Sequence, residues 1–315
     1  MAEICVIGGT RFFGKILVRE LIAQGHRVTV LTRGRASDDF GDAVRRLTAD
    51  ANDAEGLDRA VTGTAFDVVV HQMCYTPVAA LAAARAFEGR AGRLVMTSTI
   101  EVYNRDTFRH HQPAPPMSGL ALESELDPTR YDYDLSLPWH DEDFVERNYG
   151  EGKRQAESAL TQSAAFPVAI GRVAHVLSHR DEFTGRVQFL VDRIREGRRI
   201  ASFRDPGRTS LVHGDDLGRF LAWLAQADLT GPVNVCSAEP VTLYDVCAPF
   251  EVALGRSARI EEVDNASDDP DLAPFSYPAD FGMSPELAER AGFRFPPTHE
   301  WLRALAEAVS TEMRG

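Results

Sequence analysis

Short apolar runs alternate with helical patterns along the first hundred or so residues, and this alternation constrains the fold more than any other feature. EICVIGG, RVTVLTRG, DVVVHQMC and RLVMTST have the length and apolar content of buried strands, and RRLTAD indicates one more. Helical patterns lie at residues 12–24 and 78–87. Strands connected by helices form βαβ units with parallel strands. The sequence therefore predicts an α/β fold with a doubly wound parallel sheet.

The rest of the chain predicts a long excursion followed by a smaller C-terminal α/β region. Residues 104 to about 139 contain several Pro and His residues, which is typical of a surface excursion or lid. An amphipathic helix is expected at residues 141–163, and FPVAIGRV follows as a strand. VHGDDLGRFLAWLAQ indicates the end of a strand and a helix, and WLRALAEAVSTEM a terminal helix.

Composition excludes several classes of function. The net charge of −13 argues against a broad nucleic-acid or membrane surface, because phosphate-rich surfaces attract positive patches. The cysteines lack metal-site spacing, which indicates buried, reduced thiols. No apolar run approaches the ~18 residues of a membrane span, and the first strand begins too near Met1 for a signal peptide. We expect a cytoplasmic protein with a small-molecule substrate and no nucleic-acid or membrane partner, and a homodimer stays open.

The segment VIGGTRFFGKIL fits two phosphate-binding loops incompletely. As a P-loop it begins at Gly9, but Ile16 stands where a hydroxyl residue must bind Mg²⁺. As a dinucleotide-binding loop it has Gly8 and Gly14, with Arg11 in place of the middle glycine. A strand precedes the loop, and a helix and a second strand follow it, as a dinucleotide site requires. This context favours a dinucleotide site, and with it a sheet of the Rossmann type.

The end of the second strand bears on which dinucleotide binds. NAD sites usually place Asp or Glu there to bind the ribose 2′-hydroxyl, whereas this strand ends in Thr32-Arg33. Arg11 and Arg33 could together bind a 2′-phosphate, which favours NADP and leaves NAD as the alternative. Equally, Arg33 could be a solvated charge at the end of a strand.

Residues further along the chain have the pattern of an acid–base site. Tyr149 and Lys153, in YGEGKRQAE, are four residues apart and therefore share one face of a helix. Lys153 is one of only two lysines in the chain, and an ammonium beside a phenol lowers the pKa of the phenol. Thr99 ends RLVMTST and would face the crevice where ligands bind parallel sheets. A surface Tyr–Lys pair and a turn-capping Thr are the structural alternatives.

Together these features resemble the extended short-chain dehydrogenase/reductase superfamily, in its NAD-dependent epimerase/dehydratase group. The glycine loop, STIEVY, Tyr149-x-x-x-Lys153 and LVHGDDLGRFL occur in the order of that family, and TADANDAEGL resembles its adenine-contacting segment. GGTRFFG, LTRGR and DVVVHQMCYTP are similar to the atypical branch that carries GGTRFhG. The resemblance extends over most of the chain.

The resemblance implies a catalytic set and a cofactor site, with no metal. Thr99, Tyr149 and Lys153 would be the catalytic triad. Glu101 would be a further candidate base, since related sugar-nucleotide dehydratases have Thr-Asp-Glu where this chain has Thr-Ile-Glu; a solvated Glu101 is the alternative. The residues implied in cofactor binding are Gly8, Thr10, Arg11, Phe12, Phe13, Gly14, Arg33, Asp50, Ala51, His71, Met73 and Lys153. Met73, Cys74 and Tyr75 would border the nicotinamide, or simply pack in the core.

Departures from the family pattern argue against a nucleotide-diphosphate sugar as substrate. Such enzymes have R-P-x-x-V-Y-G where this chain has RVAHVLS, from Arg172 to Ser178. Thr209 takes the position of a family arginine, and Arg208 lies one residue early. Residues in or near the excursion could line a substrate pocket, although a solvated loop is the simpler interpretation: His110, His111, Trp139, His140 and Asp141.

We therefore expect an NAD(P)-binding Rossmann domain at residues 1–172, to which residues 211–238 return, and a substrate-binding domain at residues 173–210 and 239–315. The expected reaction is hydride transfer at a secondary alcohol or ketone of a sugar-like or natural-product substrate, by a ketoreductase or an epimerase. Dehydratase chemistry through Glu101 is one alternative. A non-catalytic RNA-binding protein on the same scaffold is another, because some relatives in the GGTRFhG branch are associated with RNA.

Overall fold

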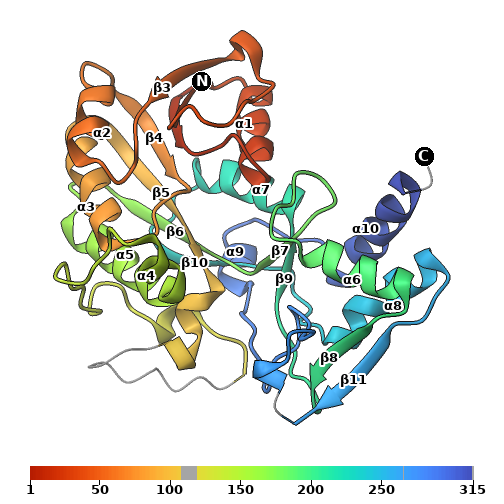
Figure 1. Cartoon of the computed structure of the whole chain (residues 1–315). Helices are drawn as coiled ribbons and strands as arrows, with labels where there is room; N and C mark the ends of the chain where they lie inside the picture. The colour runs from red at the N-terminus through yellow and green to blue at the C-terminus, as the bar shows by residue number, and fades with distance from the viewer. Residues whose placement is uncertain (108–118, 265, 314–315) are drawn as a thin grey trace.

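The computed structural model describes residues 1–107, 119–264 and 266–313, and its centre is a seven-stranded sheet (Figure 1). The strand order is β10-β6-β5-β4-β1-β2-β3, and all neighbouring strands run parallel. The strands are β1 (Glu3–Ile7), β2 (Arg27–Thr32), β3 (Val44–Thr48), β4 (Phe66–His71), β5 (Ala91–Thr99), β6 (Val168–Val173) and β10 (Gly231–Val235).

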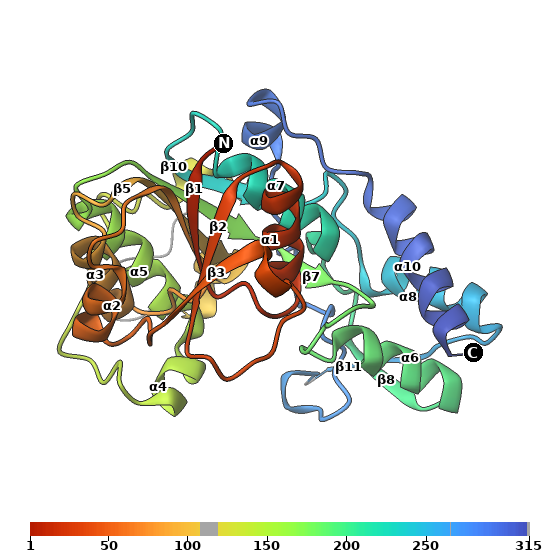
Figure 2. The same cartoon turned by 90° about the horizontal axis from the view of Figure 1, so that it is seen from above.

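Helices cover both faces of the sheet (Figure 2). The pair on one face is α1 (Phe13–Ala23) and α7 (Gly214–Leu224), and the other face carries α2 (Ala54–Val61), α3 (Pro77–Ala86) and α5 (Tyr149–Ser163). In β1, Ile4 and Val6 belong to the core under α1 and α7, whereas Cys5 and Ile7 belong to the core under α2 and α3. Successive strand side chains point to opposite faces, so a strand covered on both faces needs a continuous apolar run. The predicted fold class is confirmed.

A smaller α/β region lies on the side opposite α2 and α3 (Figures 1 and 2). In it, β7 (His175–Leu177) pairs with β9 (Leu211–His213), and β8 (Arg199–Phe203) pairs with β11 (Arg259–Val263). The helices of this region are α6 (Arg186–Glu196), α8 (Leu243–Leu254) and α10 (Thr298–Glu312), and the short α9 (Glu286–Arg290) contacts β10. Leu190, Phe250 and Trp301 lie in a separate core among α6, α8 and α10.

The helix predicted at residues 141–163 is two helices in the structure. It breaks at Asn148 into α4 (Glu142–Arg147) and α5, and α5 is not amphipathic, because every residue from 150 to 160 is buried. Its glycines explain this tight packing. A Cβ at Gly150 would lie 2.8 Å from the Glu101 carbonyl oxygen, and one at Gly152 would lie 2.6 Å from the Tyr75 carbonyl oxygen. The glycines that weaken a helix prediction are thus the residues that let α5 lie against its neighbours.

Residues 119–139 of the excursion pack some of their side chains against α5, while others stay exposed. Tyr131 and Trp139 are only 5% and 6% exposed, and the Tyr131 hydroxyl donates to Glu151 Oε2 of α5 (2.8 Å). His140 and Asp141 are exposed, and Asp141 caps α4 by accepting from the Phe144 amide (3.1 Å). His110 and His111 lie outside the described residues. The interpretation of Trp139 as part of a solvated loop is therefore wrong.

A buried ion pair joins the excursion to the sheet. Arg172 of β6 and Glu157 of α5 are both fully buried, with Nη2 and Oε2 2.7 Å apart. Arg172 also donates to the Tyr103 hydroxyl (2.8 Å) and to the carbonyl oxygens of Glu123 (3.1 Å) and Leu126 (2.8 Å). Buried charges are tolerated only when their partners satisfy them, and this network does so.

Candidate active site

The glycine loop joins β1 to α1 and is held against the end of β4. Gly8 and Gly9 have φ angles of 103° and 88°, a region that only glycine adopts readily. Gln72 accepts a hydrogen bond from the Gly9 amide (3.2 Å). A Cβ at Gly14 would lie 2.5 Å from Gln72 Oε1 and 2.8 Å from Gly9 Cα. The loop therefore needs glycine at positions 8, 9 and 14, although Arg11 stands in place of the middle glycine of the motif.

The first turn of α1 follows this loop without a protein cap. No side chain caps the helix, and no acidic residue lies in its first turn. Thr10 and Phe12 are buried, Phe13 is partly buried and Arg11 is exposed. The amides of Gly14 and Lys15 donate to the carbonyl oxygens of Arg11 and Phe12 (3.0 Å each). The positive end of the helix dipole at such an N-terminus attracts phosphate groups.

Buried polar atoms without protein partners lie at the ends of the neighbouring strands. In the part of the chain that the structure describes, His71 Nε2, Gln72 Nε2 and Thr97 Oγ1 are buried and make no hydrogen bond. Burial, with the nearby Lys153 charge, lowers the pKa of His71 to about 3, so this imidazole is neutral. Unpaired buried polar groups are costly and often mark where a ligand binds. The glycine loop and these atoms fit a nicotinamide dinucleotide.

The other residues predicted to contact the cofactor lie after β2, β3 and β4. Arg33 follows β2, is exposed, and has its Nη1 3.9 Å from Asp50 Oδ2. Ala51 is buried, whereas Met73 is 38% exposed. A contact of 3.9 Å between exposed side chains is weak, so the Arg33 guanidinium keeps most of its capacity to bind a phosphate.

Lys15, which gave the loop its likeness to a P-loop, forms an ion pair instead. Its Nζ lies 2.9 Å from Asp181 Oδ2, in the loop between β7 and α6. Phe183 of the same loop packs edge-on against Phe12, with ring centroids 5.8 Å apart. The smaller region thus reaches across to the glycine loop.

Gly14→Ala is expected to lower the free energy of unfolding by about 1–3 kcal/mol, because the added methyl group has no space between Gln72 and Gly9. The same change should weaken dinucleotide binding, since it displaces the loop. Thermal unfolding and a nucleotide titration measure the two effects. Gly171→Ala is the matched control, because a Cβ there meets only ordinary side-chain contacts, the nearest at 3.4 Å. Equal thermal stability and equal nucleotide affinity of the two variants would contradict the prediction.

Tyr149, Thr99 and Lys153 come together where α5 begins beside the end of β5. Tyr149 is the first residue of α5 and Thr99 is the last of β5, and the Thr99 side chain is close enough to lower the pKa of the Tyr149 phenol. Lys153 is 2% exposed and donates from Nζ to the Thr97 carbonyl oxygen (2.8 Å). Its Nζ lies 5.9 Å from the centroid of the Tyr149 ring. This is close enough for an electrostatic influence, but the two side chains do not hydrogen-bond.

The pKa values differ from the expectation that Lys153 lowers that of Tyr149. Although 37% of Tyr149 is accessible, the desolvation of its phenol raises its pKa, nearby Tyr75 adds to the shift, and the hydrogen bond with Thr99 opposes it. Burial lowers the pKa of Lys153 to about 8, against the influence of Cys74 and Glu157. Near neutral pH the phenol is protonated and Lys153 is charged. Tyr149 is therefore prepared to donate a proton.

Side chains from the smaller region face this group. The charges of Glu101 and Arg186 both act on the pKa of Tyr149 and on that of Tyr277. Glu101 accepts a hydrogen bond from Asn104 Nδ2 (2.8 Å). The Tyr277 hydroxyl lies 2.8 Å from Nε2 of His175, and the two rings are stacked. Arg186 and Tyr277 were missed in the sequence, because no motif or spacing links them to Tyr149.

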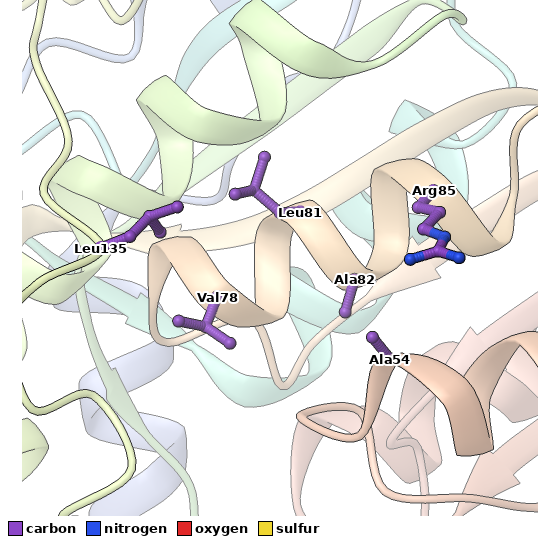
Figure 3. Close-up of a pocket in the computed structure, with 6 residues that line it drawn as sticks. All are labelled: Ala54, Val78, Leu81, Ala82, Arg85 and Leu135. Atoms are coloured by element: carbon purple, nitrogen blue, oxygen red, sulfur yellow. The ribbon is translucent and has the colours of Figure 1, made fainter.

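A shallow pocket of about 260 Å³ lies elsewhere, on the outer side of α3 (Figure 3). Leu81 and Leu135 line one part of it, and Ala82 faces Ala54 of α2 in another. None of the predicted site residues lines this pocket.

The parallel sheet and the glycine loop are typical of proteins that bind a nicotinamide dinucleotide. The chain belongs to the NAD dependent epimerase/dehydratase family, whose sequence model matches residues 4–236. The predicted family is confirmed, as is the class of NAD-dependent oxidoreductase or epimerase.

Solved structures of the family share the fold at low sequence identity. UDP-glucose 4-epimerase of Thermus thermophilus, in complex with NAD, is 20% identical, with a TM-score of 0.67 over 98% of this chain and 99% of that chain. The dTDP-glucose 4,6-dehydratase of Bacillus anthracis str. Ames, also in complex with NAD, is 13% identical, with a TM-score of 0.71 over 100% of this chain and 98% of that chain.

One relative is named as a binding protein and not as an enzyme. The chloroplast stem-loop binding protein of 41 kDa b, from Arabidopsis thaliana, is 35% identical over 80 residues, which cover 21% of each protein. The match therefore spans about a fifth of that relative. Within the described residues there is no cluster of metal-ligating side chains, and no helix is long and apolar enough to cross a membrane.

Proposed function

We propose that the protein transfers hydride between a nicotinamide dinucleotide and a secondary alcohol or ketone, with NADP as the preferred cofactor. The observation that carries the proposal is the contact of Tyr149 with Thr99 at the end of β5, with the buried Lys153 ammonium beside them. Membership of the family indicates the class of reaction, and the positions of Thr99, Tyr149 and Lys153 indicate what each side chain does in it.

In this proposal Thr99 and Tyr149 hold the reacting oxygen of the substrate between their hydroxyl groups. Tyr149 gives its proton to that oxygen when a ketone is reduced, and takes one when an alcohol is oxidised. At neutral pH the phenol of Tyr149 holds the proton that the donating direction needs. Lys153 supplies a positive charge that stabilises the phenolate left behind. A bound nicotinamide would supply or accept the hydride.

The preference for NADP rests on Arg11 of the glycine loop and Arg33 at the end of β2, which are both exposed. NAD sites usually have an acidic residue at the end of β2. A guanidinium binds a 2′-phosphate through charge-assisted hydrogen bonds. Asp50 lies 3.9 Å from Arg33 and would have to share it with the phosphate.

Arg33→Ala is expected to weaken NADPH binding by about tenfold and to leave NADH binding nearly unchanged. A titration of each nucleotide by intrinsic fluorescence measures this, with Arg35→Ala as the matched control from the same exposed turn. Equal affinity for the two nucleotides, unaffected by the substitution, would show that the NADP preference is wrong. Absence of binding of either nucleotide would refute the proposed function as a whole.

The proposal divides into a ketoreductase and an epimerase, which differ in how the cofactor is kept. A reductase exchanges its nucleotide in each turnover, whereas an epimerase regenerates it within one turnover and retains it. Nucleotide retained after purification therefore favours the epimerase. Glu101 offers a third course, deprotonation next to a transient ketone as in a dehydratase, because its charge reaches Tyr149. A screen of ketones, alcohols and nucleotide sugars, followed by product analysis, separates the three.

RNA binding is the second candidate function, favoured by the 80-residue match to the stem-loop binding protein. The net charge of −13 opposes it, since RNA binding needs a positive surface. Binding of an RNA hairpin without binding of either nucleotide, and with steep salt dependence, would favour this candidate over the enzyme.

A further inference from the structure

Tyr75 lies on Lys153, yet neither the family pattern nor the proposed roles explain this contact. Nζ of Lys153 is 4.3 Å from the centroid of the Tyr75 ring, and the Tyr75 ring is 6.1 Å from the Tyr149 ring. Tyr75 follows β4, and its carbonyl oxygen is in close approach to Gly152 of α5. One aromatic ring thus touches both members of the acid–base pair.

Lys153 has few other groups to stabilise its charge. In the described part of the structure its one hydrogen bond goes to the Thr97 carbonyl oxygen (2.8 Å). The titratable groups that face it are His71 and the Cys74 thiol from the β4–α3 connection, with Tyr149 and Glu157 from its own helix. His71 is neutral, and Glu157 is already paired with Arg172. Buried ammonium groups need such compensation to stay charged.

The face of an aromatic ring is electronegative and attracts a cation at this distance, most strongly where water is excluded. The Tyr75 hydroxyl takes no part in the contact, since its neighbour is the sulfur of Met73 at 3.8 Å. The ring alone is therefore the functional part of Tyr75.

We propose that Tyr75 is a positioning residue of the acid–base pair, whose ring keeps the Lys153 ammonium charged and in place beside Tyr149. This role rests on the proposed function, in which the Lys153 charge stabilises the Tyr149 phenolate. The contact between Tyr75 and Lys153 can nevertheless be tested without any substrate or nucleotide. We expect that an aromatic ring at position 75 is needed to keep Lys153 charged, and that the hydroxyl of Tyr75 is not.

The chain has only two lysines, so NMR of ¹³C-lysine-labelled protein can follow Lys153 directly. In a Lys15→Arg background Lys153 is the only labelled residue, and its side-chain signal should titrate near pH 8 in the otherwise unchanged protein. Tyr75→Phe should leave this titration within about 0.3 pH units, and Tyr75→Leu should lower it by about one unit. Tyr75→Trp, which keeps a ring, serves as a second variant if Tyr75→Leu folds poorly.

An unchanged or raised titration in Tyr75→Leu would overturn the proposal, because the ring would then only exclude water from the ammonium. With a substrate in hand, the alkaline limb of the kcat profile should move to lower pH in Tyr75→Leu. A loss of kcat that is uniform across pH would overturn it as well. Failure of nucleotide binding, by contrast, refutes the proposed function and leaves the NMR result intact.

Discussion

Tyr149→Phe is expected to lower kcat by about 10²–10⁴-fold on any alcohol or ketone that the wild-type protein converts, because the substitution removes the group proposed to transfer the proton. Thr99 remains beside the altered ring, and the glycine loop is untouched, so nucleotide affinity should stay within about twofold. Steady-state kinetics and the nucleotide titration measure the two effects separately.

The matched control for Tyr149→Phe is Tyr244→Phe, which removes a phenol of the smaller region that is bonded to Glu262 (3.0 Å). This variant should keep full activity. A Tyr149→Phe protein that retains more than about a tenth of the wild-type kcat would show that another group transfers the proton, and Glu101 would be the first to examine.

Arg172→Met is expected to lower the free energy of unfolding by about 3–5 kcal/mol, because it leaves the buried Glu157 carboxylate without its partner. It also removes the donors that hold the Glu123 and Leu126 carbonyl oxygens of the excursion and the hydroxyl of Tyr103. Urea unfolding followed by circular dichroism measures the change.

Two further variants separate the buried charge from simple loss of contacts. Arg172→Met combined with Glu157→Leu should recover part of the lost stability, since no unpaired charge remains in the interior. Arg59→Met, which removes an exposed ion pair with Glu55 on α2, should leave the unfolding midpoint nearly unchanged. An Arg172→Met variant as stable as Arg59→Met would show that the buried pair of Arg172 and Glu157 does not stabilise the fold.

The fold could be predicted because its signals are local. The apolar runs that become β1, β4 and β5 each carry enough continuous hydrophobic surface to be buried on both faces of a sheet. The glycine loop could be identified for the same reason, since Gly8 and Gly9 need backbone angles that few other residues adopt. The excursion and α5 could not, because the burial of Tyr131 and Trp139 depends on a surface supplied by a distant segment.

The proximity of Thr99, Tyr149 and Lys153 was predictable, but their electrostatics were not. Spacing alone put Tyr149 and Lys153 on one helix face, yet the phenol pKa is raised where the spacing led us to expect a lowered one. Desolvation depends on everything packed around a group, which a four-residue interval does not encode. Arg186 could not be anticipated either, since its charge reaches Tyr149 only through the packing of the smaller region.

The sequence by itself determined the parallel sheet, the glycine loop and the family, because each depends on short-range patterns of apolar residues, glycines and i, i+4 spacing. Only the tertiary structure decided that Lys15 pairs with Asp181, that Lys153 lies on the ring of Tyr75, and that residues 150–160 of α5 are buried. These are contacts between segments far apart in the chain. They arise when the whole core closes, and no local pattern specifies them.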